Sequence, residues 1–230
     1  MIFRPLHALS ADSIHPVLQG IPFFKTVREQ DLSQYEALVQ HSQMASFGPG
    51  EVLLSKGDHD FWLFFLLRGQ LDVFPDNGDF QDSINQITPG EVFGDLSMLT
   101  GRQRSASVRA SDSFRQTTVL GLDFRVFGRL GDFSRLTLDT KLAYYRNTAH
   151  NLRWKLDVYR MEYPDSPLAA KHRSLKLFAG KRDTLEELEA LEFQAKQLAN
   201  LLKDWNQSFT STASVQLAPE HPRASVGASY

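Results

Sequence analysis

Hydrophobic positions along this chain follow two different periods, and the change falls near residue 133. Between residues 44 and 127 the apolar residues form short runs separated by Gly, Pro, Asn and Asp, a pattern typical of β-strands joined by turns. The clearest runs are residues 52–54, 61–67, 71–74 and 119–122. After residue 133 the period becomes about three and a half residues, which predicts helices. The pattern therefore predicts an α+β fold, in which an antiparallel β part is followed by helices.

Residues 133–163 are predicted to form one long helix that ends before Pro164. Its apolar residues are separated alternately by four and three positions, which places them on a single seam. The seam consists of Leu138, Leu142, Tyr145, Ala149, Leu152, Leu156, Tyr159 and Tyr163. Because the β part is too small to cover this length, we expect the seam to pair with the same helix of a second subunit in a homodimer.

The other segments divide the chain further. We expect an irregular arm at 1–20, the β part with one helix at 21–130, a helical region at 131–206 and a mobile tail rich in Ser, Thr, Ala, Pro and Gly at 207–230. Ser166 and Pro167 mark the start of a helix expected to run to about residue 178. Thr184 and Glu187 have the spacing of a capping box for a last helix. That helix packs either in a coiled coil or against the first long helix.

The amino-acid composition excludes several classes of protein. The 230 residues are 42% hydrophobic and 23% charged, which is ordinary for a soluble globular protein, and the net charge of −2 offers no general attraction to nucleic acid. The chain has no cysteine, which excludes disulfides, thiol catalysis and zinc–thiolate sites. Its start lacks the apolar core of a secretion signal, and its longest apolar run is too short to span a bilayer. We therefore expect a cytoplasmic protein without a membrane partner.

Candidate chemistry gathers in residues 93–108. Gly94 opens a short predicted helix, whose first N–H groups can face an anion. Arg104 can bind two phosphate oxygens through its planar guanidinium, and Ser105 can donate a further hydrogen bond. The Asp95 carboxylate is repelled by phosphate, so its natural partner is a neutral donor such as a ribose hydroxyl. A cyclic nucleotide supplies both groups.

This segment resembles the phosphate-binding cassette of the cyclic-nucleotide-binding domain family, and residues 104–110 are particularly similar to the version in bacterial transcription activators of that family. Glycine motifs in residues 47–54, 56–58, 66–69 and 89–94 follow the order and spacing of the family. The resemblance implies a β-roll of the jelly-roll type. It also implies a binding site formed by Phe93, Gly94, Asp95, Leu96, Ser97, Arg104, Ser105 and Ala106.

The base of the nucleotide is expected to face the long helix. Counting from the cassette places it near the turn that contains Thr148 and Asn151, whose side chains can satisfy purine edges. Exposed helix polarity is the alternative interpretation of these residues. We favour cAMP as the ligand because of the similarity to the bacterial activators, with cGMP or another cyclic nucleotide as alternatives.

Asp95 departs from the family pattern, which has glutamate at this position. The shorter carboxylate reaches the ribose after a small backbone shift or through a water, or it loses the contact. Two structural alternatives therefore stay open. In the first, Gly94, Asp95 and Arg104 form only a turn with an internal ion pair. In the second, the protein is a scaffold that kept the roll and lost its ligand.

A DNA-binding module is not evident after the long helix. Residues 178–182 offer the only candidate turn, and the helix predicted after it begins with Glu186, Glu187, Glu189 and Glu192, which phosphates repel. We therefore expect no DNA binding, and a transcription regulator with a diverged DNA-binding region stays an alternative.

Catalytic and metal-ligating constellations are also not evident. The histidines do not recur at metal-ligand spacing, and His59 between two aspartates is expected to lie in an exposed turn. The sequence thus predicts a non-enzymatic, metal-free sensor. Cyclic nucleotide binds in the roll, the long helix responds, and the output is contact with an unidentified protein effector.

Overall fold

A computed structural model describes residues 2–6, 11–75, 80, 83–175 and 177–216. The strands are β1 (Ile2–Pro5), β2 (Ser42–Phe47), β3 (Val52–Leu54), β4 (Trp62–Arg68), β5 (Leu71–Phe74), β6 (Asn85–Ile87), β7 (Val92–Phe93), β8 (Ser107–Ala110) and β9 (Thr117–Asp123). The helices are α1 (Ala11–Gln19), α2 (Pro22–Gln30), α3 (Leu32–Gln40), α4 (Asp95–Thr100), α5 (Leu138–Glu162), α6 (Pro167–Arg173) and α7 (Leu185–Gln216). The predicted α+β class is confirmed.

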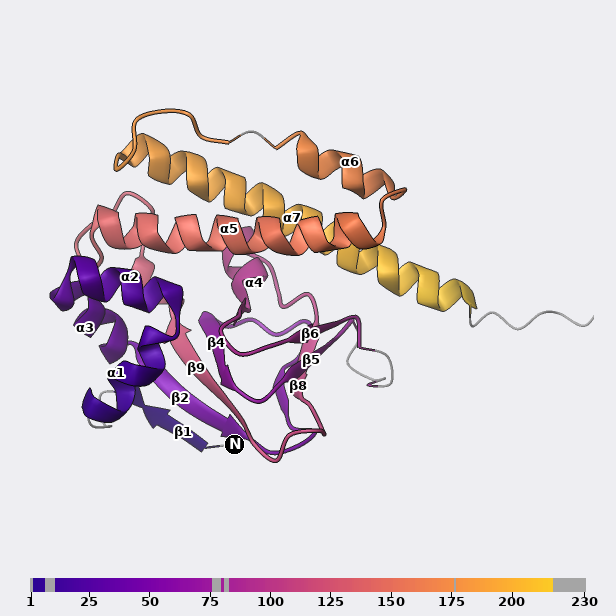
Figure 1. Ribbon diagram of the computed structural model, residues 1–230, viewed down its shortest axis with the longest axis horizontal. Helices are drawn as coiled ribbons and strands as arrows, with labels where there is room; N and C mark the ends of the chain where they lie inside the picture. The colour runs from indigo at the N-terminus through magenta and orange to yellow at the C-terminus, as the bar shows by residue number, and fades with distance from the viewer. Residues whose placement is uncertain (1, 7–10, 76–79, 81–82, 176, 217–230) are drawn as a thin grey trace, which may run out of the picture.

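Two antiparallel sheets form the β-roll, which lies beneath α5 and α7 (Figure 1). One sheet has the strand order β1-β2-β9-β4-β7, and the other has the order β3-β8-β5-β6. Successive side chains of β4 alternate between two cores, as strand geometry requires. Phe64 and Leu66 point into the roll. Leu63 and Phe65 join the core that the roll shares with the helices, so the aromatic run in this strand serves packing on both faces.

Helices α5 and α7 lie side by side across the roll (Figure 1). The α5 seam residues Leu142, Leu152 and Leu156 are fully buried in the same core as Leu188 and Leu198 of α7. The last helix therefore packs against the first long helix within one chain. The seam on which we based the homodimer is internal, so it does not support that prediction.

An ion pair links the starts of the two helices. The Arg146 guanidinium donates to both carboxylate oxygens of Glu187, at 2.9 and 2.6 Å. Thr184 caps α7 as predicted, because its hydroxyl accepts from the Glu187 N–H at 3.2 Å. Glu187, one of the acidic residues at the start of α7, is therefore paired within the chain.

Several predicted boundaries were wrong. Strand β1 and helix α1 occupy much of the expected irregular arm. The sequence predicts one helix before the strands of the β part, but the structure has two, α2 and α3, because Asp31 accepts hydrogen bonds from the N–H groups of Ser33 and Gln34 and starts α3. Helix α6 begins after Ser166 as predicted but ends at Arg173. Helix α7 continues to Gln216, so residues 207–216 are not a tail, and residues 217–230 lie outside the described part.

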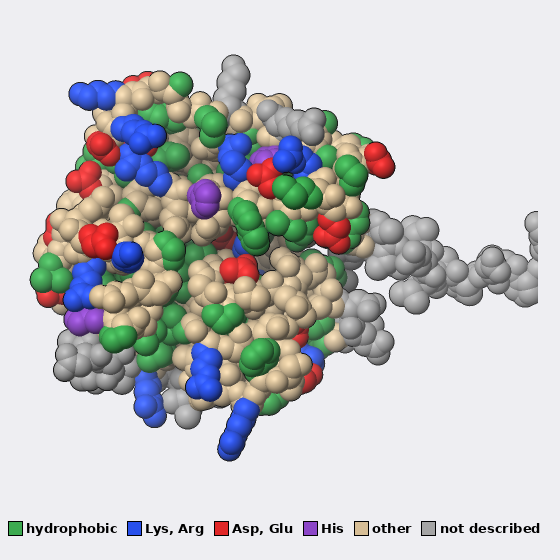
Figure 2. Space-filling view, in the orientation of Figure 1, with side chains coloured by type: hydrophobic (Ala, Val, Ile, Leu, Met, Phe, Trp, Pro, Cys, Tyr) green, Lys and Arg blue, Asp and Glu red, His purple; other side chains and the backbone are tan. Residues whose placement is uncertain are grey.

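The surface seen in Figure 2 intersperses basic and acidic side chains, without a field of one sign. Within the described part of the chain, no helix combines the length and the apolar character needed to cross a membrane.

Candidate functional site

The predicted cassette is a turn, a short helix and a return strand. Gly94 follows β7 in the left-handed conformation, with φ at 80°. A Cβ atom at this position would lie 2.7 Å from Nη1 of Arg104 and 3.2 Å from the Trp62 carbonyl oxygen. Glycine is therefore required both by the backbone and by the close approach of the arginine.

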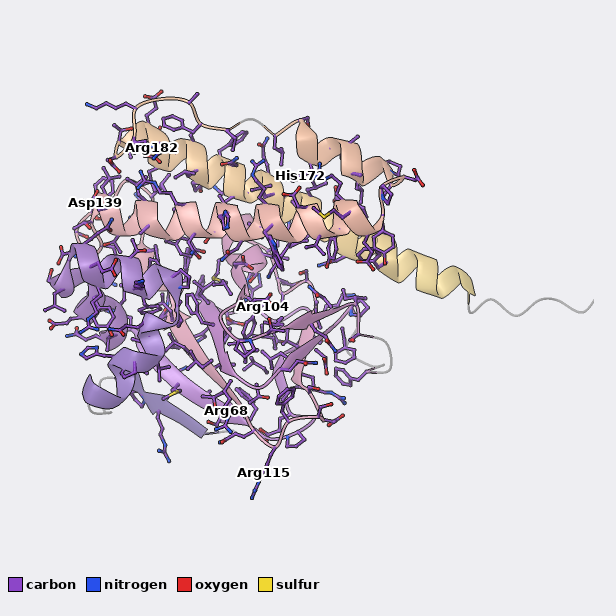
Figure 3. The ribbon with its side chains drawn as sticks, viewed as in Figure 1. Arg68, Arg104, Arg115, Asp139, His172 and Arg182 are labelled. Atoms are coloured by element: carbon purple, nitrogen blue, oxygen red, sulfur yellow. The ribbon has the colours of Figure 1, made fainter. Side chains whose placement is uncertain are left out.

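Arg104 lies inside the roll, beside α4 and beneath α5 (Figure 3). Its side chain is almost fully buried, and all five guanidinium N–H donors have partners within the chain. Nε and Nη2 bind the two carboxylate oxygens of Asp60. Nη1 donates to the Gly94 carbonyl at 2.6 Å and to Ser97 Oγ at 2.8 Å, while Nη2 also donates to the Trp62 carbonyl at 2.6 Å. The arginine thus ties β4, β7 and α4 together.

Asp60 is a site residue that the sequence analysis missed. We had placed it in an exposed turn beside His59, whereas it forms the internal ion pair with Arg104. His59 itself is exposed, as expected. The backbone reinforces the link, because the Arg104 N–H donates to the Asp58 carbonyl and the Gly57 N–H donates to the Arg104 carbonyl. No group of metal-ligating side chains occurs among the described residues.

Asp95 is the first residue of α4 and is buried. Burial raises the pKa of its carboxyl, while the Lys155 ammonium and hydrogen bonds from the Asp95 and Leu96 N–H groups oppose that shift. Lys155 in turn donates to the Val92 carbonyl at 3.2 Å. The first N–H groups of α4 are therefore directed at this carboxylate, whereas the sequence predicts that they face a phosphate.

A cavity of about 90 Å³ opens at the cassette. All the cassette residues that we predicted line it: Phe93, Gly94, Asp95, Leu96, Ser97, Arg104, Ser105 and Ala106. The opposite wall comes from Lys155 and Tyr159 of α5 and from Leu202 and Asn206 of α7.

The two predicted base contacts do not line this cavity. Thr148 is buried, and the Asn151 amide donates to Asn147 Oδ1 at 3.0 Å. The α5 residues that do reach the cavity, Lys155 and Tyr159, lie one to three turns further along the helix. The prediction that α5 borders the cavity is therefore supported, but the turns of α5 that line the cavity are those of Lys155 and Tyr159.

Replacing Asp95 by asparagine is expected to raise the free energy of unfolding at pH 7 by about 1 kcal/mol, because it removes a buried charge and keeps an oxygen acceptor for the N–H groups. The folded-state pKa of Asp95 is raised, so the wild-type carboxyl contributes less stability as the pH rises through its unfolded value of 3.8. The gain should therefore vanish below that pH. Urea unfolding at pH 3.5, 5 and 7 tests this, with the exposed Asp165→Asn as control. Equal stability of wild type and Asp95→Asn at pH 7 would contradict it.

The family model that matches this chain, and several of the curated relatives, are named for cyclic nucleotides. Residues 44–131 match the family described as cyclic nucleotide-binding domain. The cAMP-dependent protein kinase type II regulatory subunit of Drosophila melanogaster is 30% identical over 115 residues, which cover 50% of this chain and 29% of that protein. A cyclic nucleotide-gated channel of Caenorhabditis elegans is 34% identical over 79 residues, covering 32% and 10%. The chain spans less than a third of the length of these relatives.

Solved structures include a putative cyclic nucleotide-binding protein from Geobacter metallireducens, which is 18% identical with a TM-score of 0.46. The alignment covers 63% of this chain and 98% of that one.

Proposed function

Residues 44–131 belong to the cyclic nucleotide-binding domain family, and from this premise we propose that the protein is a cyclic-nucleotide sensor, with cAMP as the favoured mononucleotide. The observation that carries the proposal is the cavity at the cassette, which every predicted cassette residue lines. Matched relatives that are named as regulatory subunits of cAMP-dependent protein kinases also support cAMP.

The cyclic phosphate binds at Arg104 and Ser105. Because all the guanidinium donors have internal partners, the phosphate replaces some of them. Ser97 Oγ and the Gly94 carbonyl share Nη1, and they are the neutral partners that a charged phosphate oxygen outcompetes. Asp60 keeps its ion pair with Nε and Nη2 and holds the guanidinium in place. Asp95 accepts from the ribose hydroxyl.

The base lies against the wall formed by α5 and α7. Lys155, Tyr159 and Asn206 offer polar atoms there, and Leu202 offers an apolar surface. The cavity of about 90 Å³ is small, and we propose that a bound nucleotide displaces this wall. The displacement of α7 relative to the roll is the signal, and its size is set by the difference in ligand affinity between the two arrangements. We propose that a protein partner reads the position of the helices, and that the protein itself is not an enzyme.

DNA binding and homodimerisation have less support from the structure than contact with a protein partner. The start of α7 is acidic and does not resemble a DNA-reading helix, and its Glu187 is bound to Arg146. A homodimer through the α5 seam requires that α7 leave α5, because α7 covers that seam. A homodimer formed in that way would be a consequence of ligand binding.

Isothermal titration of the full chain with cAMP and cGMP tests the proposal. We expect saturable binding to wild type and a roughly tenfold weaker affinity in Ser105→Ala, since one hydrogen bond to a charged group is lost. Among the hydrogen bonds of the described residues, none that holds the fold involves Ser105. Its replacement therefore tests ligand binding with less effect on stability than replacement of Arg104. The exposed Ser113→Ala, in the loop between β8 and β9, is the matched control. If neither cAMP nor cGMP binds to wild type, a sensor of these mononucleotides is contradicted.

A further inference from the structure

A second cavity adjoins the cassette. It measures about 270 Å³, three times the cassette cavity in the same measure. Arg104, Ser105 and Asn206 line both cavities, so the two spaces share a wall at the phosphate-binding residues. Any ligand held by Arg104 and Ser105 therefore lies at the entrance to the second space.

Basic side chains from three separate elements surround this second cavity. Lys56 comes from the loop after β3, Arg102 follows α4, and Lys203 projects from α7. The described residues that line the cavity include no carboxylate. Gln103 and Gln207 add amide groups that can donate hydrogen bonds. The lining therefore suits an anion with several oxygen atoms.

The charges on opposite sides of the cavity interact with each other. Burial lowers the pKa of Lys203, and the nearby positive charge of Arg102 lowers it further, while Asp204 acts in the opposite direction. Asp204 also approaches Lys171, with 3.8 Å between the charged atoms, so its charge is shared. Bringing like charges together costs free energy, which an anion placed between them recovers.

We propose that this cavity binds a second phosphate of the same ligand, so that the preferred ligand is a cyclic dinucleotide. One phosphate occupies the cassette at Arg104 and Ser105, and the other lies between Lys56, Arg102 and Lys203. Because Lys203 is on α7, the second phosphate fixes the position of the helix that roofs the first. This inference rests on the proposed function, since it extends the same binding site.

Titration of the full chain with cAMP, cyclic di-AMP and cyclic di-GMP tests the inference. We expect at least one dinucleotide to bind about tenfold more tightly than cAMP. Lys203→Gln and Arg102→Gln should remove that preference and leave the cAMP affinity unchanged. Lys196→Gln is the matched control, because Lys196 lies on the same helix and pairs with Glu192.

The outcomes distinguish failure of the second phosphate site from failure of the proposed sensor function. If cAMP binds, dinucleotides bind no more tightly and Lys203→Gln changes nothing, the second phosphate subsite is wrong and the sensor remains. If inorganic phosphate in large excess tightens cAMP binding in wild type but not in Lys203→Gln, the cavity takes a separate anion and the dinucleotide proposal is overturned. If no nucleotide binds wild type, the proposed function itself fails.

Discussion

Replacing Arg104 by glutamine is expected to lower the free energy of unfolding by about 3 kcal/mol and to abolish cyclic-nucleotide binding. The variant leaves the Asp60 carboxylate without its partner and frees the carbonyl groups of Gly94 and Trp62. Removing one member of a buried ion pair costs about 3–5 kcal/mol, and we expect the lower end because Asp60 is 28% exposed.

Urea unfolding at pH 7 measures the effect. Arg115→Gln is the control, because Arg115 is an exposed arginine that projects from the far end of the roll (Figure 3). A loss of stability below about 1 kcal/mol, on the scale of a surface substitution, would show that the hydrogen bonds of Arg104 do not hold the cassette.

This structural role changes how a binding defect in an Arg104 variant is interpreted. Loss of binding could follow from a disordered cassette as well as from a missing phosphate contact. Arg104→Lys separates the two, because it keeps the charge but lacks the planar fork that spans Asp60 and the two carbonyls. We expect the lysine variant to be destabilised nearly as much as the glutamine variant and to retain weak binding.

Truncating Leu202 to alanine is expected to lower the free energy of unfolding by about 3 kcal/mol and yet to tighten cyclic-nucleotide binding about tenfold. Leu202 is 5% exposed and packs in the core between α7 and α5, so its loss leaves a void. It also lines the narrow cavity at the cassette. In the proposed binding mode the ligand displaces α7, so the variant makes room for the ligand and lowers the free-energy cost of binding.

Leu198→Ala is the matched control for this prediction. Leu198 is fully buried on the same helix, one turn earlier, and it does not line the cavity. It should lose similar stability without a gain in affinity. Unfolding by urea and titration with cAMP together distinguish the two variants. An equal affinity in both would show that α7 does not obstruct the ligand.

The cassette could be predicted from the sequence because its geometry is local. Gly94 sets the turn, and the ten residues from there to Arg104 close around one helix. For this reason every predicted cassette residue lines the cavity. Thr148 and Asn151 lie away from it, because their position depends on where α5 crosses the roll, which the packing of α2 and α7 against α5 decides.

Asp60 shows the other limit of sequence reasoning. It lies 44 residues from Arg104 in the sequence. The nearest glycine is Gly57, and no motif links Asp60 to the cassette. Its only local signal was a carboxylate two residues before a strand. The Asp60–Arg104 pairing exists because the loop before β4 and the return toward β8 are joined by main-chain hydrogen bonds.

By itself the sequence determined the fold class, the cassette and the apolar seams of α5 and α7, because alternation, glycine turns and heptad spacing act over a few residues. Only the tertiary structure decided what covers those seams. The same apolar stripe is satisfied by a second subunit or by α7 of its own chain, and the structure has α7 in that place. That choice also places Leu202, Lys203 and Asn206 on the walls of the two cavities that Arg104 and Ser105 line.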